Sequence, residues 1–130
     1  MDSLNPKDWL HRAKSNLLLG EKGTFGNVDD ILIEDFCFNL QQSVEKSLKA
    51  LLIKNNLEYP KTHSISKIIT ILINNGVQVP DNIIKTAPQL TAYAVETRYP
   101  DDYNEITDTE YKEALEIAQN VYNWVENKII

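Results

Sequence analysis

Apolar residues recur at intervals of three and four along nearly the whole chain, the spacing that places them on one face of an α-helix. The first such segment runs from Pro6 to about Glu21, with Asn5 as N-cap and proline at the first helical position. Three glycines then interrupt the pattern and predict a loop over residues 20–28.

The longest predicted helix begins after Asp29 or Asp30 as cap and continues to about Asn55. Its length indicates the central helix of the fold. The apolar positions that define it are Ile31, Phe36, Leu40, Val44, Leu48, Leu51 and Leu52.

Three further helical segments follow. Thr62 or Ser64 caps the third helix, which ends at Asn75-Gly76. The fourth starts at Pro80-Asp81, is interrupted or kinked by Pro88 and stops at Pro100. The last opens with a capping box, Thr107 to Glu110, and carries an apolar stripe of Tyr111, Ala114, Leu115, Ala118, Val121, Tyr122 and Val125.

No strand pattern, internal repeat or low-complexity tract competes with these helices. Short connections between amphipathic helices favour antiparallel neighbours. The sequence therefore predicts an all-α fold, an antiparallel up-and-down bundle of four to five helices that forms a single domain over residues 1–130.

Composition limits the chemistry. Cys37 is the only cysteine, and the two histidines, His11 and His63, do not assemble a metal site with it. A chain of 130 residues can bury roughly two thirds of its unfolded surface, so it needs no disulfide or metal for stability. We expect no cofactor.

With no signal-like N-terminus and no run of ~20 apolar residues, we expect a cytoplasmic protein without membrane contact.

The net charge of −6 argues against a general phosphate-backbone binder, and we expect no DNA partner. Any contact with nucleic acid must be local. The basic residues of the middle of the chain are explained most simply as a solvated helix face. They are Lys46, Lys49, Lys54, Lys61 and Lys67.

Polar residues form a stripe on the predicted central helix. Gln41, Glu45 and Lys49 follow one another at i, i+4 and i+8, and Gln42 begins an alternative stripe through Lys46. On a solvated surface such a stripe contributes only a few tenths of a kcal/mol. If it is buried between helices or subunits, each polar group needs a partner and the stripe confers specificity. The pattern itself favours neither alternative.

The segment from Thr97 to Tyr103 combines a guanidinium, two phenols and two carboxylates. Arg98 could simply complement a helix dipole, and Asp101-Asp102 could simply form a turn. Alternatively, Arg98 presents five donors to a phosphate or carboxylate, with Tyr99 and Tyr103 beside it and Asp102 orienting it or a ribose hydroxyl.

Four motifs in order give the chain a family resemblance. They are Trp9-Leu…Ala13, then Cys37-Phe…Gln-Gln-Ser-Val-Glu-Lys-Ser-Leu-Lys-Ala-Leu-Leu, then Lys61-Thr-His-Ser, and finally Thr97-Arg-Tyr-Pro-Asp. Together they resemble the HEPN domain family of higher eukaryotes and prokaryotes. The resemblance implies a helical bundle that forms homodimers and is often encoded beside a minimal nucleotidyltransferase in toxin–antitoxin pairs. Active members are metal-independent endoribonucleases, and others are described as nucleotide-binding or scaffold domains.

The chain departs in one feature from the catalytic members, in which about four to six residues separate the arginine from a histidine. The matching positions after Arg98 are Tyr103, Asn104 and Glu105. Tyr103 would be a poor general base, because a tyrosine has a reference pKa near ~10. His63 could supply the missing imidazole, although a cap of the third helix with a solvated ring explains it more simply.

Three functions remain open. The first is a dimeric module that binds a nucleotide, RNA or a nucleotidyltransferase partner. The second is a ribonuclease with an atypical site, for which Arg98, Tyr103 and His63 are the candidates. The third is a homodimer without ligand, in which Arg98 pairs with Glu45 of a second copy. The ligand-binding candidates of the first hypothesis are Arg98, Tyr99, Asp102, Gln41, Gln42, Glu45 and Lys49.

Overall fold

The structure, a computed structural model, describes residues 4–25, 31–94 and 106–130, and of residues 24 and 25 it describes only the backbone. Within these ranges every regular element is helical. The elements are α1 (Pro6–Glu21), η1 (Lys22–Phe25), α2 (Ile33–Lys54), α3 (Ile65–Asn74), α4 (Asp81–Thr86), η2 (Ala87–Ala94) and α5 (Asp108–Ile129), where η denotes a 3₁₀ helix. The prediction of an all-α bundle is confirmed.

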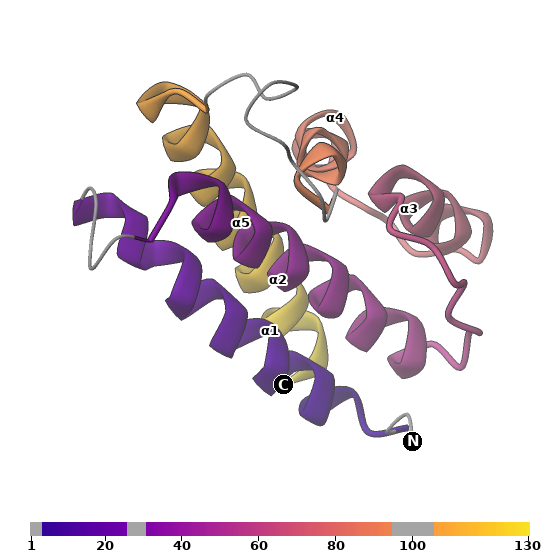
Figure 1. Cartoon of the computed structure of the whole chain (residues 1–130). Helices are drawn as coiled ribbons and strands as arrows, with labels where there is room; N and C mark the ends of the chain where they lie inside the picture. The colour runs from indigo at the N-terminus through magenta and orange to yellow at the C-terminus, as the bar shows by residue number, and fades with distance from the viewer. Residues whose placement is uncertain (1–3, 26–30, 95–105) are drawn as a thin grey trace.

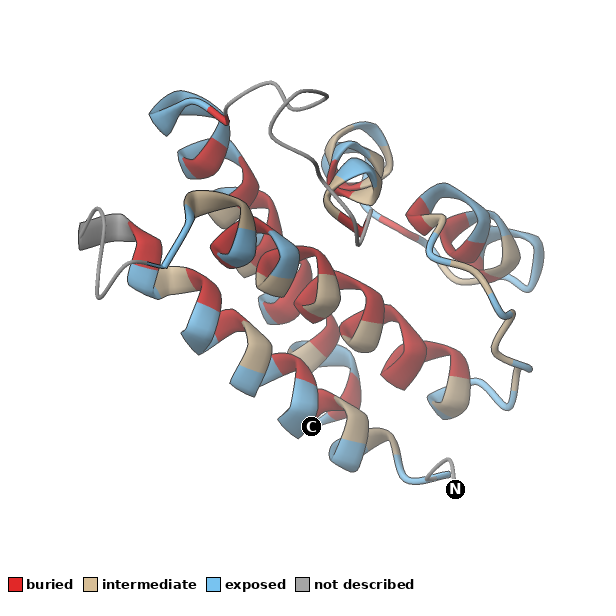
Figure 2. Ribbon diagram, viewed as in Figure 1, coloured by how far each residue is buried: buried red, intermediate tan, exposed pale blue. Residues whose placement is uncertain are grey.

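Helix α2 lies at the centre of the bundle. It contacts α1, α5, α3 and η2, and α1 runs antiparallel beside it while α5 lies behind the pair (Figure 1). Buried residues cover most of its circumference (Figure 2). The fully buried side chains include Leu40, Leu48 and Leu52 of α2, Ile65, Ile68 and Leu72 of α3, Leu90 of η2, and Val121 and Val125 of α5.

Several predicted helix ends are confirmed. The side chain of Asn5 accepts a hydrogen bond from the Lys7 amide at 3.0 Å. Ser64 caps α3 by accepting from the Lys67 amide, and Thr107 and Glu110 form the reciprocal capping box of α5. Pro88 interrupts the fourth segment as expected, because the α-helix ends at Thr86 and continues as a 3₁₀ helix.

The start of α2 differs from the prediction. Leu32, not Asp29 or Asp30, is the N-cap, and its side chain makes no capping hydrogen bond. Glu34 and Asp35 lie in the first turn instead, where carboxylates complement the positive end of the helix dipole. Ile31, predicted as the first apolar position of this helix, lies before the helix and is exposed.

The predicted loop over residues 20–28 begins too early. Helix α1 instead continues through Gly20 to Glu21. Gly20 does not break the helix but lies where α1 packs closely against α2. A Cβ at position 20 would lie 2.6 Å from Cγ of Leu40 and 3.2 Å from the carbonyl oxygen of Phe36. The hydroxyl of Tyr111 also donates to the Gly20 carbonyl at 2.6 Å and so ties α5 to the end of α1.

In the described part of the chain, none of the helices has the length and apolar character needed to cross a membrane.

Candidate functional site

The polar stripe of α2 is buried. Gln41, Glu45 and Lys49 keep only 0%, 4% and 7% of their surface exposed. The sequence favoured neither a solvated nor a buried stripe, and the structure shows that the stripe is buried. The solvated face predicted for the basic residues is therefore wrong for Lys49, although Lys54, Lys61 and Lys67 are exposed. Burying charged groups costs free energy unless they are paired, so the arrangement of their partners is informative.

The carboxylate of Glu45 is the centre of this site. Its Oε2 accepts hydrogen bonds from the amide nitrogens of Gln41 at 3.0 Å and Gln42 at 3.2 Å. Its Oε1 accepts from the hydroxyl of Tyr59 at 3.3 Å. The Gln42 amide also donates to Oε1 of Gln41 at 2.7 Å, which fixes the orientation of both amides. Hydrogen bonds from several donors lower the free-energy cost of burying a carboxylate.

His63 reaches the same carboxylate from outside the bundle. Its Nδ1 lies 3.0 Å from Oε1 and 3.3 Å from Oε2 of Glu45. The side chain of His63 is 62% exposed, whereas that of Glu45 is 5% exposed. A neutral imidazole that donates from Nδ1 to Glu45 has its other ring nitrogen, Nε2, available as an acceptor. The prediction of a solvated imidazole is thus correct only in part, because the ring is exposed but its Nδ1 contacts Glu45.

The segment between α2 and α3 holds His63 in place. The amide of Ser64 donates to Oγ1 of Thr62 at 3.0 Å, and the amide of Ile65 donates to Oγ1 of Thr91 in η2 at 3.2 Å. These bonds fix the backbone on the C-terminal side of the histidine. At the start of the segment, Asn56 follows the C-cap Asn55 of α2 and adopts a left-handed conformation with a φ of 58°, as is common directly after a helix.

Lys49 lies one helical turn beyond Glu45 and between two aromatic rings. Its ammonium nitrogen is 3.8 Å from the ring centroid of Trp9 in α1 and 4.0 Å from that of Tyr59. Such cation–π contacts stabilise a cation that has lost most of its water. Tyr59 therefore contacts both Glu45 and Lys49 and joins the two charges into one site.

A cavity of about 490 Å³ opens beside Lys49 and Tyr59. Its remaining walls are formed by Leu4, Ile53, Asn56, Leu57 and Glu58. Its volume falls within the range of small-molecule sites, roughly 300–1,000 Å³, and its walls combine apolar and polar side chains as such sites do.

Some predicted site residues lie outside the described residues. They are Arg98, Tyr99, Asp101, Asp102 and Tyr103. Their position relative to Glu45 and His63 stays a prediction. Of the remaining candidates, the structure brings Gln41, Gln42, Glu45 and His63 together directly and connects Lys49 through Tyr59.

Sequence reasoning missed Tyr59 and Trp9. Trp9 appeared only in the first motif of the family resemblance, and the structure shows that its half-buried ring contacts Lys49 of the neighbouring helix. Tyr59 lies in a connecting segment without periodicity, so no local pattern could place its hydroxyl on Glu45. Across the part of the chain that the structure covers, no three His, Cys, Asp or Glu side chains are grouped to hold a metal ion.

Comparisons with known proteins agree on one family. The model of the HEPN domain matches residues 6–128. The crystal structure of TT1696 from Thermus thermophilus superimposes with a TM-score of 0.77 and 31% sequence identity, over 95% of this chain and 97% of that one. The structure of ST0689, an archaeal HEPN homologue, gives a TM-score of 0.75 and 28% identity over the full length of both chains. No curated protein matches. With a domain match over nearly the whole sequence and the same bundle in these relatives, the chain belongs to the HEPN domain family.

Proposed function

We propose that this HEPN domain protein is a dimeric binding module for a nucleotide or RNA and works with a nucleotidyltransferase partner in a system of the toxin–antitoxin type. The observation that carries the proposal is the convergence of Gln41, Gln42, Tyr59 and His63 on the buried carboxylate of Glu45. Folding of a helical bundle does not require such a group, and hydrophobic residues of similar volume often stabilise a core as well or better.

The chemistry of the cluster suits a nucleotide. With Nδ1 of His63 and both N–H groups of Gln42 used inside the cluster, Nε2 of His63 and the amide oxygen of the half-buried Gln42 remain as acceptors for the amino group of a base or for ribose hydroxyls. Strong binding of a phosphate is the task of a permanently charged group with several donors. We assign that task to Arg98, which the family resemblance implies as a site residue and whose rigid donors suit a phosphate.

A titration with nucleoside monophosphates tests the site. We expect His63→Asn and Gln42→Ala to weaken binding, because both side chains are accessible and their loss leaves the apolar core unchanged. A hydrogen bond to an uncharged partner contributes about 0.5–1.5 kcal/mol, so each variant should bind roughly 2- to 10-fold more weakly. His11→Asn, which removes the other histidine from the exposed face of α1, is the matched control and should bind normally. Equal affinity in wild type and both site variants contradicts the proposal.

The partner is tested separately. We expect the gene beside this one to encode a minimal nucleotidyltransferase and the two proteins to copurify when they are expressed together. Separate elution of the two proteins would contradict the pairing while leaving the nucleotide site intact.

A second candidate function is supported by the contact between Glu45 and His63. A carboxylate on Nδ1 orients an imidazole and supports proton transfer at Nε2, as in hydrolases with an acid–histidine pair. In this case the protein would cleave RNA without the motif histidine. We expect little cleavage, because loss of a general acid or base typically slows a reaction by ~10²–10⁴. Robust metal-independent cleavage that disappears in His63→Asn would favour this second function over simple binding.

A further inference from the structure

The imidazole of His63 has one nitrogen bound inside the protein and one nitrogen open to the outside. Nδ1 lies 3.0 Å from Oε1 of Glu45, while the side chain as a whole is mostly exposed. Among the described residues, Nε2 of His63 has no hydrogen-bond partner. A carboxylate that holds the proton on Nδ1 leaves the lone pair of a neutral imidazole on Nε2. The surface therefore presents a nucleophilic nitrogen of defined tautomer.

Glu45 does not need His63 in order to be buried. Its two carboxylate oxygens already accept hydrogen bonds from the side chains of Gln41, Gln42 and Tyr59. These neutral donors meet the requirement that a buried polar group be hydrogen-bonded. The additional contact with His63 acts mainly on the imidazole, because a carboxylate on one ring nitrogen sets the tautomer and the orientation of the ring.

The backbone next to His63 is held as well. The amide of Ser64 donates to Oγ1 of Thr62 at 3.0 Å, and the amide of Ile65 donates to Oγ1 of Thr91 at 3.2 Å. Ser64 is also the N-cap of α3. An imidazole that is fixed at its backbone and at Nδ1 loses little freedom when Nε2 reacts, and this lowers the entropic part of a reaction barrier.

We propose that His63 is a phosphoryl acceptor, which takes a phosphoryl group on Nε2 from a small phosphoramidate, a donor with a phosphorus–nitrogen bond. Histidine is one of the side chains that form covalent intermediates, and a neighbouring group that orients it makes it an effective nucleophile. The proposal concerns the covalent state of the protein itself. It goes beyond the proposed binding of a nucleotide and does not depend on it.

The transfer balances in atoms and electrons. The lone pair of Nε2 forms a bond to phosphorus while the phosphorus–nitrogen bond of the donor breaks, and the electron pair of that bond leaves with ammonia. The phosphorylated imidazole is positively charged and keeps its proton on Nδ1. The Glu45 carboxylate at 3.0 Å stabilises this charge as it develops. Because one phosphorus–nitrogen bond replaces another, the step needs no further source of energy and no oxidant.

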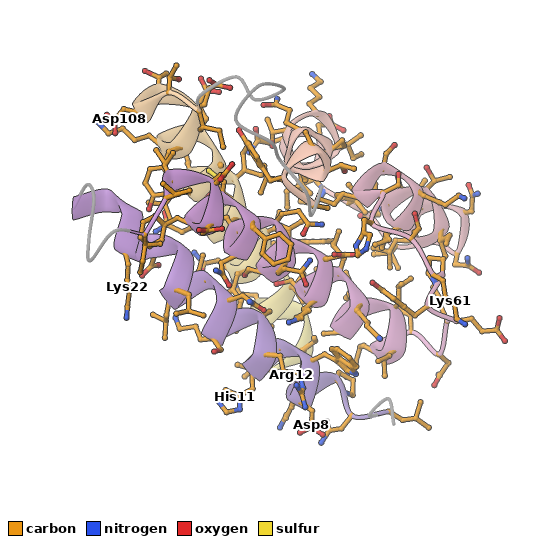
Figure 3. All side chains as sticks on the ribbon, in the orientation of Figure 1. Asp8, His11, Arg12, Lys22, Lys61 and Asp108 are labelled. Carbon is orange, nitrogen blue, oxygen red and sulfur yellow. The ribbon has the colours of Figure 1, made fainter. Side chains whose placement is uncertain are left out.

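His11 provides a control within the same chain. Figure 3 shows His11 on α1, and it shows Lys61, two residues before His63, on the connecting segment at a separate place on the molecule. Both histidines are exposed. Among the described residues, a hydrogen bond to a ring nitrogen is found at His63 but not at His11. The two rings therefore differ in the carboxylate contact and not in their access to solvent.

Reaction of the purified protein with potassium phosphoramidate, followed by mass spectrometry without acid, tests the proposal. We expect His63 to be phosphorylated about 10-fold faster than His11, because a hydrogen bond to a charged group typically changes a rate or an equilibrium by a factor of about 10 or more. In protein unfolded by urea, the two histidines should react at similar rates. Phosphorus NMR should place the group on Nε2 of His63 alone, whereas an unrestrained ring reacts at both nitrogens.

Glu45→Gln separates the charge of this residue from its packing. Glutamine has nearly the same shape and still offers an acceptor to the neutral donors, but it does not balance a positive imidazole. We expect the rate at His63 to fall to that at His11, with the rate at His11 and the circular dichroism spectrum unchanged. An unchanged ratio of the two rates in a folded Glu45→Gln variant would show that Glu45 has only a structural role here and would overturn the proposal.

The comparison of the two histidines in the wild type decides the proposal even if Glu45→Gln does not fold. Equal rates at His63 and His11 in the folded protein overturn it, and so does phosphorylation of His63 on Nδ1. These results leave the nucleotide site untouched, because nucleotide binding is measured on unmodified protein. A failed nucleotide titration, in turn, leaves the reactivity of His63 as proposed.

Discussion

Nδ1 of His63 lies 3.0 Å from Oε1 of Glu45, and this contact joins a mostly exposed imidazole to a carboxylate inside the bundle. The two residues come from different segments, the middle of α2 and the connection before α3. Glu45 thus has partners on its own helix, on the connecting segment and at the surface. This position makes it both a structural centre and the inner end of the proposed binding site.

We expect Glu45→Ala to destabilise the fold by about 1–3 kcal/mol. The substitution leaves the fully buried amide of Gln41 without its acceptor, and an unsatisfied buried donor costs free energy of that order. Urea unfolding followed by circular dichroism measures the change. Glu116→Ala on the exposed face of α5 is the control and should change stability by less than about 0.5 kcal/mol. Equal stability of the two variants would show that the cluster contributes nothing to folding.

Helix identity was predictable from the sequence because it depends on local patterns. The cap at Asn5, the capping box at Thr107 and the break at Pro88 all follow from chemistry within a few residues. The start of α2 was not predictable in this way. Two aspartates offered caps, but the helix begins after Leu32, which has no capping group, so its start is not set by local capping.

The site was predictable only in part. The spacing of Gln41, Glu45 and Lys49 identified one face of a helix, but periodicity does not say whether that face meets solvent or another helix. The burial of this face at Lys49 depends on Trp9 and Tyr59, which belong to other segments of the chain. Contacts of this kind depend on tertiary packing, and a single sequence contains no local signal for them.

Gly20→Ala should destabilise the protein although alanine is the better helix former. A helical interior normally gains up to about 1 kcal/mol from this exchange. Here the new methyl group would collide with the Leu40 side chain, and overpacking typically costs about 1–3 kcal/mol. We expect a net loss in thermal unfolding. Ser15→Ala, on the exposed face of the same helix, should be neutral or slightly stabilising, and a stabilised Gly20→Ala would refute the close approach of α1 and α2.

Tyr122 should resist ionisation. Burial, the hydrogen bond to Glu126 and the charge of Glu126 together raise the pKa of its phenol from an ordinary value of 10.0 to about 12. Because the folded pKa lies above the unfolded one, this contribution to stability is complete below pH 10 and disappears as the pH rises toward 12. The ¹³C resonance of the ring carbon that bears the hydroxyl should titrate accordingly. Titration near the ordinary value would contradict the part-buried hydrogen bond between Tyr122 and Glu126.

We expect a homodimer in solution. The structure leaves large apolar side chains exposed at the end of the bundle where α1 finishes and α2 starts. Leu18 is 50% exposed, Leu32 57% and Phe38 36%. Apolar groups gathered on one region commonly mark an interface between proteins. Sedimentation velocity at micromolar concentration measures the state directly, and a single monomeric species would rule out the dimer.

Titration of wild type and Arg98→Ala with a nucleotide, with the oligomeric state monitored in both, tests the proposed function most directly. If Arg98 binds the phosphate, its loss removes a charge-assisted interaction of about 1.5–3 kcal/mol and weakens affinity roughly 10- to 150-fold while the variant stays dimeric. A variant that becomes monomeric would instead assign Arg98 to the subunit interface. Unchanged affinity in a dimeric Arg98→Ala variant would contradict the proposed nucleotide site.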